Sequence, residues 1–115
     1  MAREFGRKVD ILIKKLPSDE KFRLIPQMKR AKLSITNNLA EGYGRYHFQE
    51  NIQFCRQSRG SIYELIDDFM ECFECGYLGE KQCGEYKQQG YELIKVLNGY
   101  IAKTKQMKAE YSDST

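Results

Sequence analysis

Five carboxylates in the second half of the sequence could bind a cation. They recur at three- and four-residue steps, which places them along one face of a helix. These residues are Glu64, Asp67, Asp68, Glu71 and Glu74. Carboxylate oxygens bind hard divalent cations. A metal site in a helical bundle draws its ligands from several helices, and the sequence has no Glu-x-x-His pair and no matching carboxylate cluster elsewhere. We interpret the stripe as an electrostatic contact surface.

The cysteines suggest a zinc site at first sight, because Cys72 and Cys75 form a Cys-x-x-Cys pair and Cys83 follows. A structural zinc site needs four ligands, usually from two pairs. The second pair is absent, and His47, the only histidine, is distant in sequence. No secretion signal precedes them, so Cys55 and the other three are interpreted as free thiols. The sequence therefore predicts no metal and no cofactor.

No catalytic arrangement can be built from the remaining residues. A Ser or Cys nucleophile with a histidine base and an acid cannot be argued around His47. The glycines are scattered singly, so no phosphate-binding glycine loop exists. We therefore predict that the chain is not an enzyme.

Basic side chains suggest contact with phosphate instead. Residues 1–45 contain 11 Lys and Arg against 5 Asp and Glu, whereas residues 46–115 contain 8 against 11. Lys and Arg neutralise phosphates and release counterions, largely without regard to sequence. The predicted nucleic-acid-binding residues are Arg3, Arg7, Lys14, Lys29, Arg30, Lys32 and Arg45, and Lys103, Lys105 and Lys108 add positive charge near the end of the chain. The alternative is a solvated surface that keeps the protein soluble.

The two oppositely charged halves could also attract each other between copies of the chain. Acidic residues of one copy would then face the basic half of the next, which is the head-to-tail contact that closes a ring. Two apolar residues outside the main stripes could be buried in that contact. The predicted oligomer interface consists of Ile11, Leu33, Asp67, Asp68 and Glu71.

Polar residues beside the apolar Ile35 and Leu39 suggest a structural network. Polar groups at the margin of a core cost free energy unless they are hydrogen-bonded. We expect a network between the second and third helices, built from Asn37, Asn38, Glu41 and Glu64, with Arg45 beside it.

The elements that position these residues are helical, because apolar residues recur at helical spacing through almost the whole chain. The first segment ends at Pro17, and the others run over about 19–42, 48–75 and 80–107. Pro26 is awkward for a helix that begins at Asp19, so we expect a short 3₁₀ or irregular turn first, with Pro26 near the first position of the helix that follows. The expected inward residues are Phe5, Val9, Leu12, Ile13, Leu16, Leu24, Met28, Ala31, Ile35, Leu39, Ile52, Cys55, Ile62, Leu65, Ile66, Phe69, Phe73, Tyr86, Gly90, Leu93, Ile94, Leu97, Tyr100 and Ile101. Gly60 and Ser61 invite close approach by a neighbouring helix.

These segments predict an all-α fold, an up-down-up-down antiparallel four-helix bundle with a short first helix. Residues 1–110 would form one domain and residues 111–115 a frayed tail. A three-helix bundle with an arm is the structural alternative. No apolar run approaches the roughly 20 residues of a membrane span, and the N-terminus is unlike a signal peptide. We therefore expect a cytoplasmic protein without a membrane partner.

Two motifs resemble those of the four-helix-bundle proteins known as 23S ribosomal RNA intervening-sequence proteins. One is the helix ending Ser34-Ile35-Thr36-Asn37-Asn38-Leu39-Ala40-Glu41-Gly42-Tyr43-Gly44-Arg45. The other is Gly60-Ser61-Ile62-Tyr63-Glu64-Leu65, and Gly76-Tyr77-Leu78 and Leu97-Asn98-Gly99 match later parts of the family pattern.

The resemblance implies a bacterial four-helix bundle without catalytic activity, because none is established for most members. Ring-shaped homopentamers are known in the family. A related branch, the accessory proteins of diversity-generating retroelements, binds nucleic acid and a reverse transcriptase through a basic surface. We therefore expect a non-catalytic accessory or scaffold protein that forms a homo-oligomer, a pentamer, and binds RNA or a nucleic-acid-processing protein. The alternative is a protein-protein interaction module without nucleic-acid binding.

Overall fold

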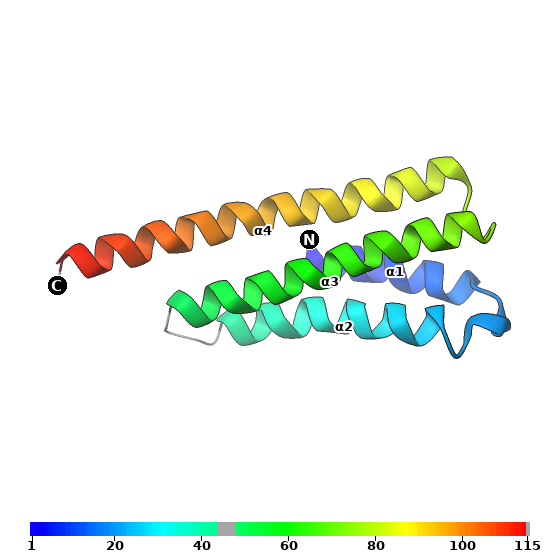
Figure 1. Ribbon diagram of the computed structural model, residues 1–115, viewed down its shortest axis with the longest axis horizontal. Helices are drawn as coiled ribbons and strands as arrows, with labels where there is room; N and C mark the ends of the chain where they lie inside the picture. Colours follow the sequence, from blue (N-terminus) through cyan, green and yellow to red (C-terminus); the bar gives the residue numbers. More distant parts are fainter. Residues whose placement is uncertain (44–47, 115) are drawn as a thin grey trace.

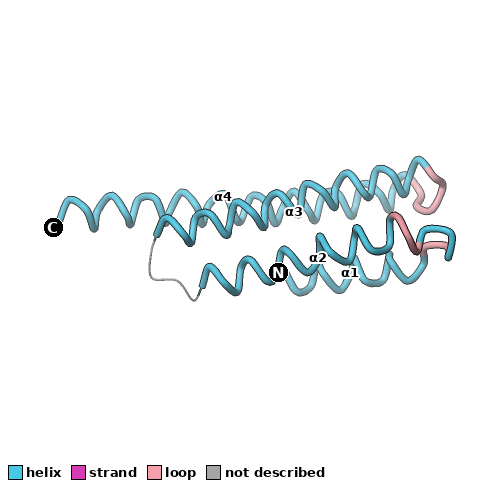
Figure 2. Tube along the Cα trace, turned by 60° about the horizontal axis from the view of Figure 1, so that its bottom comes forward, coloured by secondary structure: helices cyan, strands magenta, loops and turns pink. Residues whose placement is uncertain are grey.

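The chain folds into four helices in a computed structural model, which describes the backbone of residues 1–43 and 48–114 and the side chains of residues 1–40 and 48–111. The helices are α1 (Ala2–Lys15), α2 (Leu24–Tyr43), α3 (Phe48–Glu74) and α4 (Glu80–Ser114), with a short 3₁₀ turn at Ser18–Glu20. Consecutive helices run antiparallel and pack side by side (Figures 1 and 2). No strand occurs in the described backbone. The predicted up-down-up-down four-helix bundle is confirmed.

Local sequence explains where the helices begin and end. Leu16 has extended backbone (φ −70°, ψ 144°), as a residue before proline prefers. Pro26 lies in the first turn of α2, where its missing N–H is not needed. Gly76 has a φ of +81° in the turn between α3 and α4, a conformation that is cheap only for glycine. The predicted boundaries rest on these local effects.

The first helix is a full member of the bundle over its own length. Phe5, Val9 and Leu12 are at most 4% exposed, and the Phe5 ring packs edge to face on Phe69 of α3 with 6.2 Å between centroids. The Tyr86 hydroxyl of α4 donates a hydrogen bond to the Lys8 carbonyl at 3.2 Å. These contacts exclude the alternative of three helices with a loose arm.

The two ends of the bundle differ because the helices differ in length. We call the end with the turns at residues 17–23 and 75–79 the loop end, and the opposite end, toward the last residues of α4, the open end (Figure 1). α1 has 14 residues and α4 has 35, so the core toward the open end is built by α2, α3 and α4. Over the described residues, no helix has the length and hydropathy of a membrane span.

Three details differ from the sequence-based expectations. Phe73 is 39% exposed rather than inward. Gly60 is exposed, and a Cβ built on it meets nothing within 4 Å, whereas one built on Gly90 would lie 3.0 Å from Ile66 Cγ1. Close helix approach therefore occurs at Gly90. Helical backbone also continues to Ser114, so the expected domain limit at residue 110 does not coincide with the end of α4.

Candidate nucleic-acid interface

The basic surface is centred on the line of contact between α1 and α2. A Cβ built on Gly6 would lie 3.3 Å from Lys32 Cε, so the Lys32 side chain packs across α1 at this glycine. Lys32 Nζ also forms an ion pair with Asp10 Oδ2 at 2.7 Å. Six cations are exposed on these two helices: Arg3, Arg7, Lys14, Lys15, Lys29 and Arg30. We call the five of them that the sequence predicted, all but Lys15, the α1/α2 basic surface; Arg30 lies at its margin, where its charge acts on Asp68 of α3.

Two of the predicted phosphate-binding residues stand apart from this surface. The charge of Lys32 is compensated by Asp10, and its side chain is 25% exposed. Lys32 should therefore attract a phosphate less strongly than the exposed cations do. Arg45 lies outside the described residues. Of the additional lysines, Lys103 and Lys105 are exposed on α4, whereas Lys108 Nζ donates to Gln49 Oε1 at 3.0 Å.

Apolar side chains accompany the α1/α2 basic surface. Ile11 is 52% exposed and Leu33 is 53% exposed, and both lie on helices that carry the exposed cations. Such residues suit a protein contact as well as a nucleic-acid contact. Their place in an oligomer interface stays a prediction.

The acidic stripe of α3 is divided between the surface and the interior. Glu64 and Asp67 are exposed, and Glu71 accepts a hydrogen bond from Arg23 Nη1 at 3.1 Å. Asp68 is only 3% exposed. It accepts a hydrogen bond from Gln27 Nε2 of α2 through Oδ1, while Oδ2 is buried without a hydrogen-bond partner in the described structure. The predicted surface role of Asp68 is therefore wrong, because packing against α2 removes it from solvent.

Burial changes the acid–base behaviour of Asp68. Desolvation disfavours the charged carboxylate, and the nearby charges of Glu64 and Asp67 act in the same direction; together they raise the pKa of Asp68 to about 6 despite the hydrogen bond from Gln27. A carboxyl group with this pKa is a candidate for a functional site only where a substrate can reach it. Asp68 lies inside the helix interface, so we assign it a structural role.

The polar contacts between α2 and α3 use serines, and the predicted Asn38 joins them through Ser34. Ser58 Oγ donates to the Ile35 carbonyl at 2.9 Å, and Ser61 Oγ and Ser34 Oγ are 2.8 Å apart. Within α2, Asn38 Nδ2 donates to Ser34 Oγ at 3.0 Å and to the Ser34 carbonyl at 2.8 Å.

Of the predicted network, Asn37 and Glu64 are exposed, and the side chain of Glu41 lies outside the described residues. Ser58 and Ser61 could have been found from the sequence, because they interrupt the apolar face of α3.

A polar cluster at the loop end was not predicted from the sequence. Glu20 is 5% exposed and accepts hydrogen bonds from Arg23 Nε at 2.8 Å, Arg23 Nη2 at 2.6 Å and the Tyr77 hydroxyl at 2.6 Å. The hydrogen bonds from Arg23 have the largest effect, and together with the bond from Tyr77 they lower the pKa of Glu20. The hydrogen bond that the Tyr77 hydroxyl donates to Glu20 raises the pKa of Tyr77 to about 12. The i,i+3 spacing of Glu20 and Arg23 was visible in the sequence, but their partners Tyr77 and Glu71 were not.

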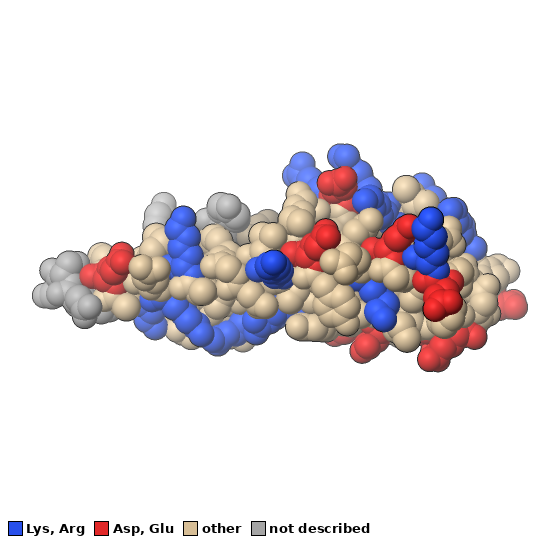
Figure 3. Space-filling model, turned by 90° about the horizontal axis from the view of Figure 1, so that it is seen from above, with Lys and Arg blue, Asp and Glu red and all other residues tan. Residues whose placement is uncertain are grey.

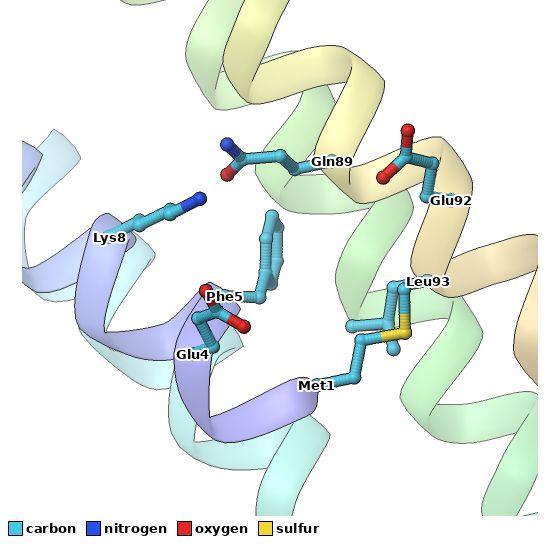
Figure 4. A pocket seen from close by; sticks show the side chains of 7 residues that line it. All are labelled: Met1, Glu4, Phe5, Lys8, Gln89, Glu92 and Leu93. Atoms are coloured by element: carbon cyan, nitrogen blue, oxygen red, sulfur yellow. The ribbon is translucent and has the colours of Figure 1, made fainter.

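Two hollows lie beside the N-terminus of α1. The first, of about 180 Å³, is shown in Figure 4 and is lined by Met1, by Glu4, Phe5 and Lys8 of α1, and by Gln89, Glu92 and Leu93 of α4. The second, of about 320 Å³, is largely apolar and is lined by Met1, Ala2, Leu39, Asn51, Cys55, Leu93, Val96, Leu97 and Tyr100. Burial raises the pKa of the Cys55 thiol, which disfavours the reactive thiolate. Neither set of lining residues forms a nucleophile–base pair.

The cysteines also lie apart from any metal-binding arrangement in the described part of the chain. Cys55, Cys72 and Cys83 are buried, and Cys75 is exposed. Within residues 1–40 and 48–111, no group of three or more His, Cys, Asp or Glu side chains is arranged to hold a metal ion.

Comparison with known proteins agrees with the fold. The model of the family described as 23S rRNA-intervening sequence protein matches residues 1–99. Curated proteins include none that matches the chain. The family match spans all of α1, α2 and α3 and more than half of α4. The chain therefore belongs to the 23S rRNA-intervening sequence protein family.

Proposed function

We propose that this chain is a non-catalytic accessory or scaffold protein of the bacterial cytoplasm that binds RNA through the α1/α2 basic surface. The observation that carries the proposal is the presence of five exposed cations on two adjacent antiparallel helices, namely Arg3, Arg7, Lys14, Lys29 and Arg30. Membership of the 23S rRNA-intervening sequence protein family supports RNA over other polyanions.

The chemistry of the surface favours contact with the phosphate backbone. Arg and Lys pair with phosphate oxygens by charge-assisted hydrogen bonds, and such contacts carry little base information. The Asp10–Lys32 ion pair at 2.7 Å holds the two helices together without occupying the five exposed cations. We therefore expect binding that depends strongly on salt and weakly on sequence.

A titration of the purified protein with a structured RNA fragment tests this function directly. At low salt we expect a Kd of about 1 μM or tighter, which weakens steeply as salt approaches the physiological concentration, because bound cations release counterions from the RNA. Absence of binding at low salt would contradict the proposal.

Charge reversal locates the binding surface. Arg7 and Lys29 are exposed and lie near the Asp10–Lys32 ion pair, so we expect Arg7→Glu with Lys29→Glu to weaken RNA binding by about tenfold or more. Lys81→Glu with Lys87→Glu, which makes the same change in net charge on α4, is the matched control. Circular dichroism shows whether both proteins stay folded. Equal losses in the two proteins would contradict binding through α1 and α2.

A protein-protein interaction module is the second candidate, favoured by the half-exposed Ile11 and Leu33. Exposed apolar side chains among polar ones are typical of interaction sites. The partner would be a second copy, in the pentamer implied by the family resemblance, or another helical protein that processes nucleic acid. Leu33→Asp would then abolish the protein contact and leave RNA binding unaffected, whereas the RNA-binding proposal predicts the reverse for Arg7→Glu with Lys29→Glu.

A further inference from the structure

The turn that joins α1 to α2 carries the most exposed large apolar side chain among the described residues. Phe22 is 87% exposed, whereas Leu24, two residues later, is 1% exposed. A phenylalanine ring in water forgoes the free energy that burial of its large apolar area would supply. Single exposed apolar side chains are common on protein surfaces, so the surroundings of Phe22 decide whether it is a binding site.

The backbone on either side of Phe22 is held in place. Arg23 Nη2 donates to Glu20 at 2.6 Å, and Glu20 also accepts from the Tyr77 hydroxyl. Backbone hydrogen bonds join Arg23 N to the Glu20 carbonyl at 3.1 Å and Gln27 N to the Arg23 carbonyl at 3.3 Å. A side chain on a backbone that is already ordered loses less entropy on binding, so this turn is suited to present the ring to a ligand.

Phe22 continues the outer stripe of α2. Leu24 and Met28 are buried and mark the inner side of the helix, and a helix turns by about 100° per residue. The turn before α2 keeps the hydrogen-bond spacing of a helix, so positions 22, 26 and 29 fall on the opposite side. Phe22, Pro26 and Lys29 are all exposed. Because Lys29 is two helical turns from Phe22, about 10 Å, the ring lies at the loop end of the α1/α2 basic surface.

Positive charge surrounds the ring. Residues 14–30 contain six Lys and Arg against two Asp and Glu, and one of these two carboxylates, Glu20, is paired with Arg23. Lys21 Nζ lies over the Phe22 ring, 5.1 Å from its centroid, which is a cation–π contact. Since Phe22 is 87% exposed, the opposite face of the ring is open to solvent.

The carboxylates of the loop end gather apart from this positive charge. Residues 61–74 of α3 contain five Asp and Glu and no Lys or Arg. In the loop-end half of the molecule, at the right of Figure 3, Lys and Arg crowd the upper edge, whereas Asp and Glu lie along the lower edge. A polyanion is therefore attracted to one side of the loop end and repelled from the other.

We propose that Phe22 stacks on an unpaired base of the bound RNA, while Lys21 and Lys29 pair with the flanking phosphates. This inference rests on the proposed function and names its substrate, which is RNA with a single-stranded segment, such as a loop or a bulge. Bases within a duplex already stack on one another, whereas an unpaired base can turn out and stack on an aromatic side chain. The contact needs one copy of the chain, so it holds equally for a monomer and for each copy in a ring.

A base suits the surroundings of Phe22 better than a protein pocket does. The centres of protein interfaces are depleted of lysine, because burial of a charged group without a partner is costly. Lys21 lies against the ring, so a protein that enclosed Phe22 would also bury that charge. In a stacked complex the ammonium group of Lys21 lies beside phosphate and gains a partner of opposite sign.

Titration of Phe22→Ala with a short oligouridine and with an RNA duplex of the same length tests the stacking. We expect binding of the oligouridine to weaken about fivefold or more, because stacking of a base on an aromatic ring contributes at least that much. Binding of the duplex and the salt dependence with either probe should not change, since the phosphate contacts remain. Phe22→Tyr keeps the ring and should bind like the unaltered protein. Tyr91→Ala removes an aromatic ring that is 47% exposed on α4, and it is the matched control.

Fluorescence gives a second measurement that keeps an aromatic ring at the turn. The sequence contains no Trp, so Phe22→Trp introduces a single indole there, and Tyr91→Trp introduces one on α4 as the control. Stacking on a base quenches indole fluorescence, so oligouridine should quench Phe22→Trp strongly and Tyr91→Trp weakly. Inorganic polyphosphate carries the charge without the bases and should quench neither.

The outcomes separate this inference from the proposed function. Absence of RNA binding by the unaltered protein would contradict both. Unchanged binding of oligouridine by folded Phe22→Ala, or equal losses with oligouridine and duplex, would overturn the stacking inference alone and leave RNA binding in place. Unchanged binding would also leave the exposed ring for a protein contact. Circular dichroism shows whether each variant stays folded.

Discussion

Gln27 on α2 donates a hydrogen bond to Asp68 on α3, and this bond joins the two helices through a carboxyl group that is 3% exposed. The bond does not offset the cost of burying a charge, since the pKa of Asp68 is raised to about 6. An ordinary Asp has a pKa of about 3.9. The folded protein therefore binds a proton at Asp68 more tightly than the unfolded chain does.

The pH dependence of stability follows from this difference. Because the pKa of Asp68 is raised in the folded protein, the contribution of this group to the free energy of unfolding is complete below about pH 4. That contribution is lost as pH rises through about 6. We expect the unfolding free energy contributed by this group to fall by on the order of 2 kcal/mol between pH 4 and pH 7. Asp68→Asn keeps the oxygen that accepts from Gln27 and removes the titration. Urea unfolding across this range checks the prediction, with Asp67→Asn as the exposed control.

The test compares the free energy of unfolding of each variant with that of the unaltered protein at the same pH. The stability of Asp68→Asn relative to the unaltered protein should increase from pH 4 to pH 7, while Asp67→Asn should show a smaller change. Parallel curves for the unaltered protein and Asp68→Asn would refute a raised pKa at this position.

The cluster of Glu20, Arg23 and Tyr77 at the loop end should give stability the opposite dependence on pH. Hydrogen bonds from Arg23 and Tyr77 lower the pKa of Glu20, so this stabilisation is present above the unfolded pKa and is lost as pH falls through the folded pKa. We expect Arg23→Ala to lower the melting temperature at pH 7, and to lower it less as the pH falls below the pKa of an unfolded Glu, about 4.3, and through the lower folded pKa of Glu20. Thermal unfolding followed by circular dichroism measures both effects.

Lys29→Ala on the exposed part of α2 is the control for that experiment. It removes a cation for which no hydrogen bond or ion pair is seen in the described structure. A destabilisation by Arg23→Ala that stays constant with pH would show that Glu20 is not the partner responsible.

Gly90 and Gly84 of α4 should respond differently to alanine. Alanine favours a helix interior over glycine by roughly 1 kcal/mol. A Cβ on Gly84 meets nothing within 4 Å, so Gly84→Ala should stabilise the protein by about 0.5–1 kcal/mol. A Cβ on Gly90 lies 3.0 Å from Ile66 Cγ1 and 3.1 Å from Ile66 Cδ1, and overpacking of this kind costs about 1–3 kcal/mol.

Chemical denaturation of the two variants measures the contrast, and Ile66→Val provides a test of its cause. Removing the Cδ1 atom should relieve part of the clash, so Gly90→Ala should be tolerated better together with Ile66→Val than alone. Stabilisation of the protein by Gly90→Ala alone would contradict the close approach of α3 and α4 at this residue.

The four cysteines should differ in reactivity. Burial raises the pKa of Cys72 to about 12 and also raises those of Cys55 and Cys83, whereas Cys75 is exposed. The thiolate is the reactive form, so iodoacetamide at pH 7.5 should modify Cys75 first in the folded protein. Mass spectrometry of protease fragments identifies the modified residue.

Two controls complete the labelling experiment. Unfolding in urea should make all four cysteines reactive, and Cys75→Ser should abolish rapid labelling of the folded protein. Rapid modification of Cys72 without denaturant would contradict the burial of that residue between the helices.

The fold could be predicted from the sequence because its causes are local. Apolar residues such as Val9, Leu12 and Met28 recur at the helical period, and any packing of these helices must bury them. Pro17 fixes its own φ, and Gly76 permits the positive φ of its turn, regardless of distant neighbours. These local effects determined the number of helices, their order and most of their boundaries, and the short turns then required neighbouring helices to be antiparallel.

The partners of the polar side chains could not be predicted, because they depend on how each helix is rotated about its axis. A change of one residue turns the helix face by about 100°, and a broad apolar stripe tolerates such changes at its margins. Asp68 and Asp67 are neighbours in a stripe that looks uniformly exposed, yet one is buried against Gln27 and the other is exposed. Glu20 and Tyr77 meet only because both turns lie at the same end.

The sequence by itself therefore determined the four helices and the presence of a basic and an acidic half, since composition and period are properties of single segments. Only the tertiary structure decided which charges remain available at the surface. It paired Lys32 with Asp10, buried Asp68 and left Arg7 and Lys29 exposed, because these outcomes depend on distances between helices that no single segment contains.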